Sequence, residues 1–112
     1  MNNYASHWTK EELLIYTLIY CANADHNESL IETNFIKSKI QHSNYEILKS
    51  EFEKDSPFTR IQKIKEAFDN NDFSAHEKED FFDDMRELFL VDRKFSSKEQ
   101  SLFQSIVNVI ED

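Results

Sequence analysis

Two pairs of acidic residues share one spacing and carry the clearest potential chemistry in this 112-residue sequence. Glu32 follows Asp25 by seven residues, and Glu99 follows Asp92 by the same interval. A hard divalent cation takes several oxygen ligands at about 2.0–2.6 Å, usually from more than one carboxylate together with carbonyls and water. The two pairs therefore define a candidate metal site of Asp25, Glu32, Asp92 and Glu99, with Ca²⁺, Mg²⁺ or Mn²⁺ as the candidate cofactor.

The same spacing also fits a purely structural role. Ser29 stands three residues before Glu32, and Ser96 stands three residues before Glu99. In a capping box the serine side chain accepts a hydrogen bond from the helix backbone, and the glutamate side chain accepts one from the serine backbone. Capping alone and cation binding both stay open on these residues. An EF-hand is excluded, because its glutamate comes eleven residues after the first aspartate and its sixth position is glycine.

An acidic stretch offers a second kind of chemistry. Residues 66–92 hold ten acidic against two basic side chains, whereas residues 33–65 hold seven basic against four acidic ones. Such a run is usually a solvated helix face, but it can also receive a basic partner protein. The candidate partner-binding residues are Asp80, Asp83 and Asp84. A net charge of -9 argues against nucleic-acid binding, which requires a basic face.

The elements that must position these residues are expected to be helices. The chain has no glycine and one proline, so tight hairpin turns are disfavoured. Capping-box patterns recur along the chain, at Thr9…Glu12, Ser29…Glu32, Ser43…Glu46, Ser74…Glu77 and Ser96…Glu99. Pro57 after Ser56 suits the first position of a further helix. We expect an all-α fold with one domain over residues 1–112 and six helices, near 9–24, 29–41, 43–54, 56–69, 74–91 and 96–111.

The spacing of apolar residues supports these helices and predicts which of them is central. The first is apolar almost all round, from Leu13 to Tyr20, which predicts that the others pack around it. Phe81 and Phe82 are adjacent on the fifth helix. If the two rings cannot both point inward, one of them is an exposed anchor for a partner.

The chain also resembles itself at an offset of 67 residues. Leu18 falls on Met85, and beyond the loop Asp25 falls on Asp92 and Glu32 on Glu99. Both copies read as an apolar helix, an aspartate, a serine cap, a glutamate and a second apolar helix. This pattern predicts two similar helical hairpins, by duplication or by convergent loop chemistry.

The loop residues resemble those of a known family. The segment Tyr20-Cys21-Ala22-Asn23-Ala24-Asp25, with Glu32 after it, is similar to the acidic loop of the TerB-like (tellurite-resistance) family, and Leu90-Val91-Asp92 with Glu99 resembles the same loop again. His26 and Arg93 stand where that family has glycine. The resemblance implies an all-helical duplicated fold, metal binding through acidic residues, and partners in membrane-associated stress complexes.

Other residues point away from catalysis. Cys21 falls on an apolar helix face, so we expect a buried, inert thiol rather than a nucleophile paired with His26. The sequence shows no catalytic constellation, no secretory signal and no apolar stretch long enough to span a bilayer. We therefore expect a cytoplasmic, non-enzymatic protein. It is either a TerB-like stress-response accessory module with a cation site, or a metal-free adaptor whose acidic helix face binds a basic partner.

Overall fold

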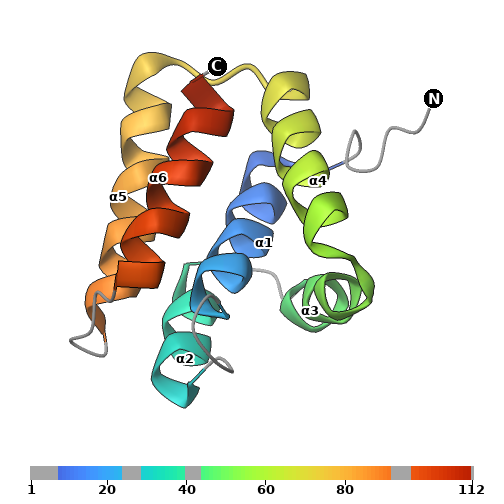
Figure 1. The fold of residues 1–112 in the computed structure, drawn as a ribbon, viewed down its shortest axis with the longest axis vertical. Helices are drawn as coiled ribbons and strands as arrows, with labels where there is room; N and C mark the ends of the chain where they lie inside the picture. The colour runs from blue at the N-terminus through green and yellow to red at the C-terminus, as the bar shows by residue number, and fades with distance from the viewer. Residues whose placement is uncertain (1–7, 24–28, 40–43, 92–96, 112) are drawn as a thin grey trace.

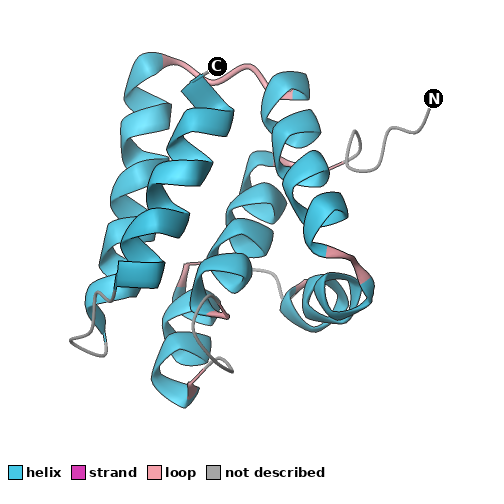
Figure 2. Ribbon diagram, viewed as in Figure 1, coloured by secondary structure: helices cyan, strands magenta, loops and turns pink. Residues whose placement is uncertain are grey.

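All regular structure in the described part of the chain is helical (Figures 1 and 2). The computed structural model describes residues 8–23, 29–39, 44–91 and 97–111. Their helices are α1 (Lys10–Ala22), α2 (Leu30–Ser38), α3 (Tyr45–Lys54), α4 (Pro57–Asn70), α5 (Ala75–Val91) and α6 (Ser97–Glu111). The predicted all-α bundle of about six helices is confirmed, with ends that differ by a few residues from those expected.

Capping boxes start three of these helices, as predicted. The Glu12 backbone donates to the Thr9 hydroxyl at 3.1 Å while the Thr9 backbone donates to Glu12 Oε1 at 2.9 Å. Ser74 and Glu77 repeat this exchange at 3.1 and 2.9 Å before α5. The third box, at Ser29, belongs to the candidate site. Each box satisfies backbone donors that a helix start would otherwise leave without a partner.

Of two other helix starts, that of α4 agrees with the expectation and that of α3 differs in detail. Helix α4 begins at Pro57, with Ser56 accepting from the Thr59 backbone, as predicted. Helix α3 begins one residue later than its pattern indicates, with Asn44 as the N-cap and no side-chain cap. The Asn44 amide instead donates to Glu12 Oε2 at 2.7 Å, which ties the start of α3 to the start of α1. Ser43 and Ser96 lie outside the described residues.

Helix α1 is the central element, as its apolar sequence predicts. It packs against α3, α4 and α5, and it also contacts α2 and α6 (Figure 1). Leu13, Tyr16, Leu18 and Ile19 are completely buried. Because other helices surround α1, this helix can be apolar on nearly all sides without exposing its apolar residues to water. Most side chains between Leu13 and Ala22 therefore lie inside the bundle.

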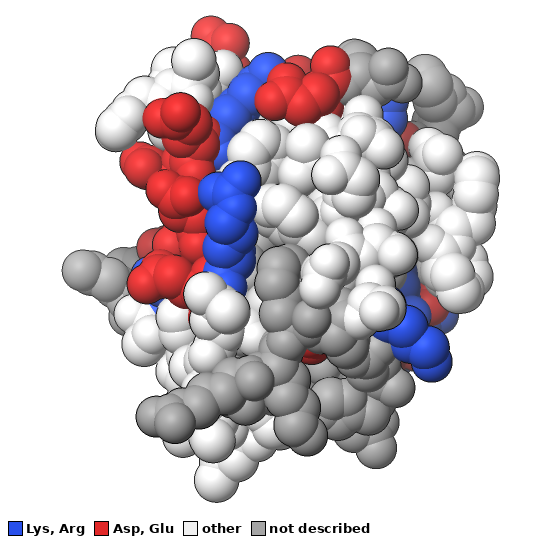
Figure 3. Space-filling model, turned by 60° about the vertical axis from the view of Figure 1, so that its left-hand side comes forward, with Lys and Arg blue, Asp and Glu red and all other residues white. Residues whose placement is uncertain are grey.

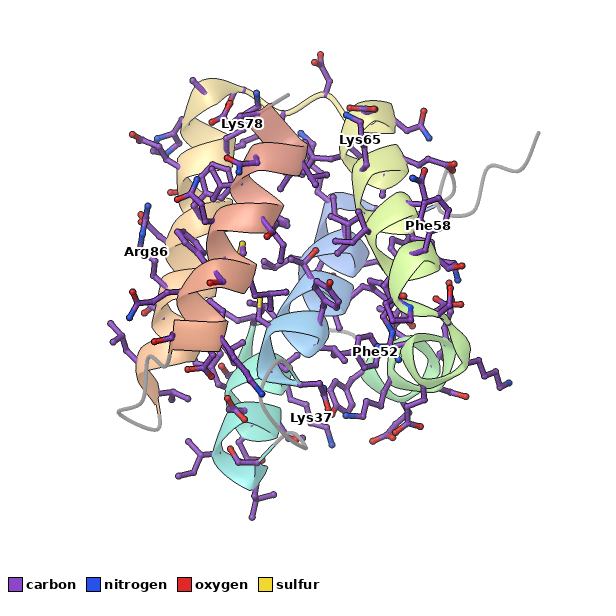
Figure 4. All side chains as sticks on the ribbon, in the orientation of Figure 1. Lys37, Phe52, Phe58, Lys65, Lys78 and Arg86 are labelled. Carbon is purple, nitrogen blue, oxygen red and sulfur yellow. The ribbon has the colours of Figure 1, made fainter. Side chains whose placement is uncertain are left out.

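Phe81 and Phe82 are both buried, so neither ring is the exposed anchor that one reading of the sequence allowed. Phe81 meets Phe68 edge to face at 5.4 Å between ring centroids, and Phe82 meets Phe103 at 6.4 Å. The two rings point inward because α5 is covered by α1 on one side and α6 on the other. Phe58 of α4 is exposed instead, at 71%, while Phe52 of α3 is buried (Figure 4).

Several residues paired by the 67-residue offset have similar environments, although buried Tyr16 falls on exposed Asp83. Helices α1 and α2 contact each other, as do α5 and α6. The matched pairs that are both buried are Ile15 and Phe82, Leu18 and Met85, Cys21 and Leu88, Ala22 and Phe89, and Glu32 and Glu99. The last pair is unusual, because glutamate is almost never fully buried unless it is paired. Among the described helices, none has both the length and the apolar character needed to cross a membrane.

Candidate functional site

The two predicted glutamates lie inside the bundle, at the first turns of α2 and α6. Glu32 is 0% exposed and Glu99 is 2% exposed. The two predicted aspartates of the metal site, Asp25 and Asp92, lie outside the described residues. The structure therefore describes the glutamate half of each acidic loop.

Glu32 does complete a capping box. The Ser29 backbone donates to Glu32 Oε1 at 2.9 Å, and the Glu32 backbone donates to Ser29 Oγ at 3.1 Å. The structural role is thus confirmed for this residue. It does not account for the burial, since Glu77 completes the same motif with its side chain 43% exposed. A capping glutamate can face water, whereas Glu32 is withdrawn from it.

Both glutamates lie close to Cys21, near the end of α1. Burial raises the pKa of the Cys21 thiol, and the negative charges of Glu99 and Glu32 raise it further. The free thiol is buried, as the sequence indicates. Glu32 and Glu99, which are 67 residues apart in the chain, thus both lie near enough to Cys21 for their charges to act on its thiol, and we name these three residues the Cys21 cluster (Cys21, Glu32 and Glu99).

The Cys21 cluster does not by itself complete a metal site. Within residues 8–23, 29–39, 44–91 and 97–111, no group of three or more histidine, cysteine, aspartate or glutamate side chains is arranged to hold a metal ion. Ca²⁺ takes six to eight oxygen ligands, and Mg²⁺ takes six. A site at this place would therefore need Asp25, Asp92, backbone carbonyls or water in addition to the two glutamates.

A second buried polar group lies at the other half of α1, and sequence analysis did not find it. The Tyr16 hydroxyl donates to Asp55 Oδ2 at 2.6 Å. Lys63 of α4 pairs with that same aspartate at 2.8 Å and also with Glu51. We name these four residues the Tyr16 cluster (Tyr16, Glu51, Asp55 and Lys63). The burial of Lys63 could not be predicted, because the sequence around it does not differ from that around an exposed lysine on a helix.

The protonation of the Tyr16 cluster follows from these contacts. Burial alone would lower the pKa of Lys63, but the carboxylates of Asp55 and Glu51 outweigh this effect and raise the pKa. Burial also raises the pKa of Tyr16, and its hydrogen bond to Asp55 raises it further. The cluster therefore holds a charged lysine and a neutral tyrosine at ordinary pH. These contacts stabilise the packing of the helices and do not indicate a reactive site.

The three predicted partner-binding residues differ in how they are engaged. Asp80 and Asp83 are exposed, whereas Asp84 is partly buried. Asp83 pairs with Arg86 at 2.8 Å, and Asp84 pairs with Lys39 at 3.2 Å. Figure 3 shows acidic side chains in a column on this side of the molecule, with basic side chains next to it. The acidic face exists, but part of its charge is already balanced within the chain.

Comparison with known proteins gives one informative relative. No known family profile matches the chain, and no solved structure matches it. A similar curated protein is the "Negative regulator of PDR1-mediated fluconazole resistance JJJ1" of Candida glabrata, which is 30% identical over 113 residues. The match covers 99% of this chain and 17% of that protein. The chain thus corresponds to a small part of its relative.

Proposed function

We propose that this chain is a non-enzymatic, TerB-like accessory module of the tellurite-resistance kind, which binds a divalent cation between its two acidic loops. In this proposal Asp25, Glu32, Asp92 and Glu99 supply carboxylate ligands, and Ca²⁺, Mg²⁺ or Mn²⁺ is the cation. The module works in the cytoplasm and joins a protein partner, such as a membrane-associated stress complex.

The burial of Glu32 and Glu99 around Cys21 carries the proposal. Carboxylate oxygens are ligands that suit Ca²⁺, Mg²⁺ and Mn²⁺, and the two halves of the chain each bring one such group near Cys21. The paired hairpins and the recurring Asp…Glu spacing support the TerB-like assignment, because they supply equivalent ligands from two sides. The name of the fungal relative, which describes a regulator, is compatible with a module that lacks enzymatic activity.

Isothermal titration calorimetry with Ca²⁺, Mg²⁺, Mn²⁺ and Zn²⁺ tests this function on the wild-type chain and on Asp25→Asn. We expect at least one ion to bind the wild type at concentrations below about a millimolar, and Asp25→Asn to weaken that binding about tenfold or more. The absence of binding heat from all four ions at millimolar concentration would remove the cation function.

The acidic face of α5 favours a second candidate, a metal-free adaptor for a basic partner protein. Asp80 and Asp83 are exposed on this helix, and the chain as a whole carries a charge of -9. Complementary charge speeds encounter with a basic surface and is weakened by salt. Binding of such a partner should therefore decrease steeply as ionic strength rises, without dependence on any cation at the Cys21 cluster.

A further inference from the structure

A hollow lies between α1 and α5, next to the C-terminal end of α2. It has a volume of about 270 Å³, with Leu14 and Phe81 at its floor and with Glu77, Asp80 and Asp84 along its α5 side. Small-molecule sites usually occupy about 300–1,000 Å³. The hollow is thus better matched to one long side chain than to a small molecule.

The two ends of the hollow between α1 and α5 are filled by the chain's own lysines. Lys10 Nζ lies 2.9 Å from Glu77 Oε2 and 2.8 Å from the Asp72 carbonyl oxygen, and it stands 5.0 Å from the centroid of the Phe73 ring. Lys39 Nζ lies 3.2 Å from Asp84 Oδ1 at the other end. Both lysines show how this surface accommodates an ammonium group, with a carboxylate for the charge and apolar side chains for the stem.

Asp80 lies between these two ion pairs. It follows Glu77 by three residues and precedes Asp84 by four, so the three carboxylates share one side of α5. Its side chain is 63% exposed and pairs with His76 of the same helix at 3.4 Å. The central carboxylate of the row is thus open to solvent, next to the apolar floor formed by Leu14 and Phe81.

We propose that this hollow receives an arginine or lysine side chain from a basic segment of a partner protein. The cationic head group binds Asp80, and the aliphatic stem lies on Leu14 and Phe81. The charge of the chain, -9, is complementary to such a segment. This inference rests on the adaptor function proposed above, and it assigns binding of the cationic side chain to one residue of the acidic face, Asp80.

Fluorescence anisotropy at low salt tests the inference with a labelled peptide in which arginine alternates with alanine. We expect Asp80→Asn to weaken binding of this peptide about tenfold. The matched control is Asp83→Asn, which removes the same charge from the same helix but does not line the hollow. We expect the control to weaken binding less than about twofold.

The other outcomes are distinguishable. Equal weakening by the two variants would overturn the inference and leave an adaptor that uses only its overall charge. Competition by free spermine as strong as that by the arginine peptide would overturn the assignment to a protein segment. No binding of the peptide to the wild type would overturn both the inference and the adaptor function, while the cation titration would stand by itself.

Discussion

The two halves of α1 contact two buried polar clusters that differ in where their members come from. In the Tyr16 cluster, Lys63 balances Glu51 and Asp55, and these three residues lie on neighbouring helices of one segment of the chain. In the Cys21 cluster, Glu32 comes from α2 and Glu99 comes from α6. The first arrangement holds α3 and α4 against α1. The second involves both halves of the chain, and in the sequence each half has an aspartate seven residues before its glutamate, which makes it the better candidate for a ligand site.

Removing Lys63 should have the largest effect on stability. Lys63→Met leaves the partly buried carboxylates of Glu51 and Asp55 without their lysine, so we expect a loss of about 2 kcal/mol in the free energy of unfolding. Lys65→Met is the matched control, since Lys65 pairs with Asp69 at an exposed site and should cost less than about 0.5 kcal/mol. Urea denaturation measures both. Equal losses would contradict the structural role of the Tyr16 cluster.

The Cys21 thiol should give a smaller effect that depends on pH. Its pKa is raised in the folded state, so above its ordinary value near 8.5 the unfolded chain releases a proton that the folded chain keeps. Unfolding is therefore favoured as pH rises, by about 1.4 kcal/mol per pH unit. Between pH 8.5 and 9.5, roughly, we expect wild type to lose about 1 kcal/mol more than Cys21→Ala in urea denaturation. Equal losses in the free energy of unfolding of the wild type and Cys21→Ala over this pH range would contradict a raised pKa of the Cys21 thiol.

Local patterns predicted most of the fold. Helix starts at Thr9, Ser56 and Ser74 were recognisable because a capping motif lies within four residues, and α1 was recognisable as central because it is apolar all round. The pairs of Lys10 with Glu77 and of Lys39 with Glu87 could not be predicted, since their partners are 67 and 48 residues apart in the chain. The burial of Glu32 was also hidden, because an exposed capping glutamate has the same sequence pattern.

The central claim is that the two acidic loops contribute to one cation site. Calorimetry on Glu32→Gln, Glu99→Gln and the double variant tests it most directly, with Glu77→Gln as the control for an exposed capping glutamate. We predict that each single variant weakens the same binding event about tenfold, that the double variant loses less than the sum of the two free-energy changes, and that the control binds like wild type. Independent, fully additive losses, or binding unchanged in both single variants, would contradict a shared site.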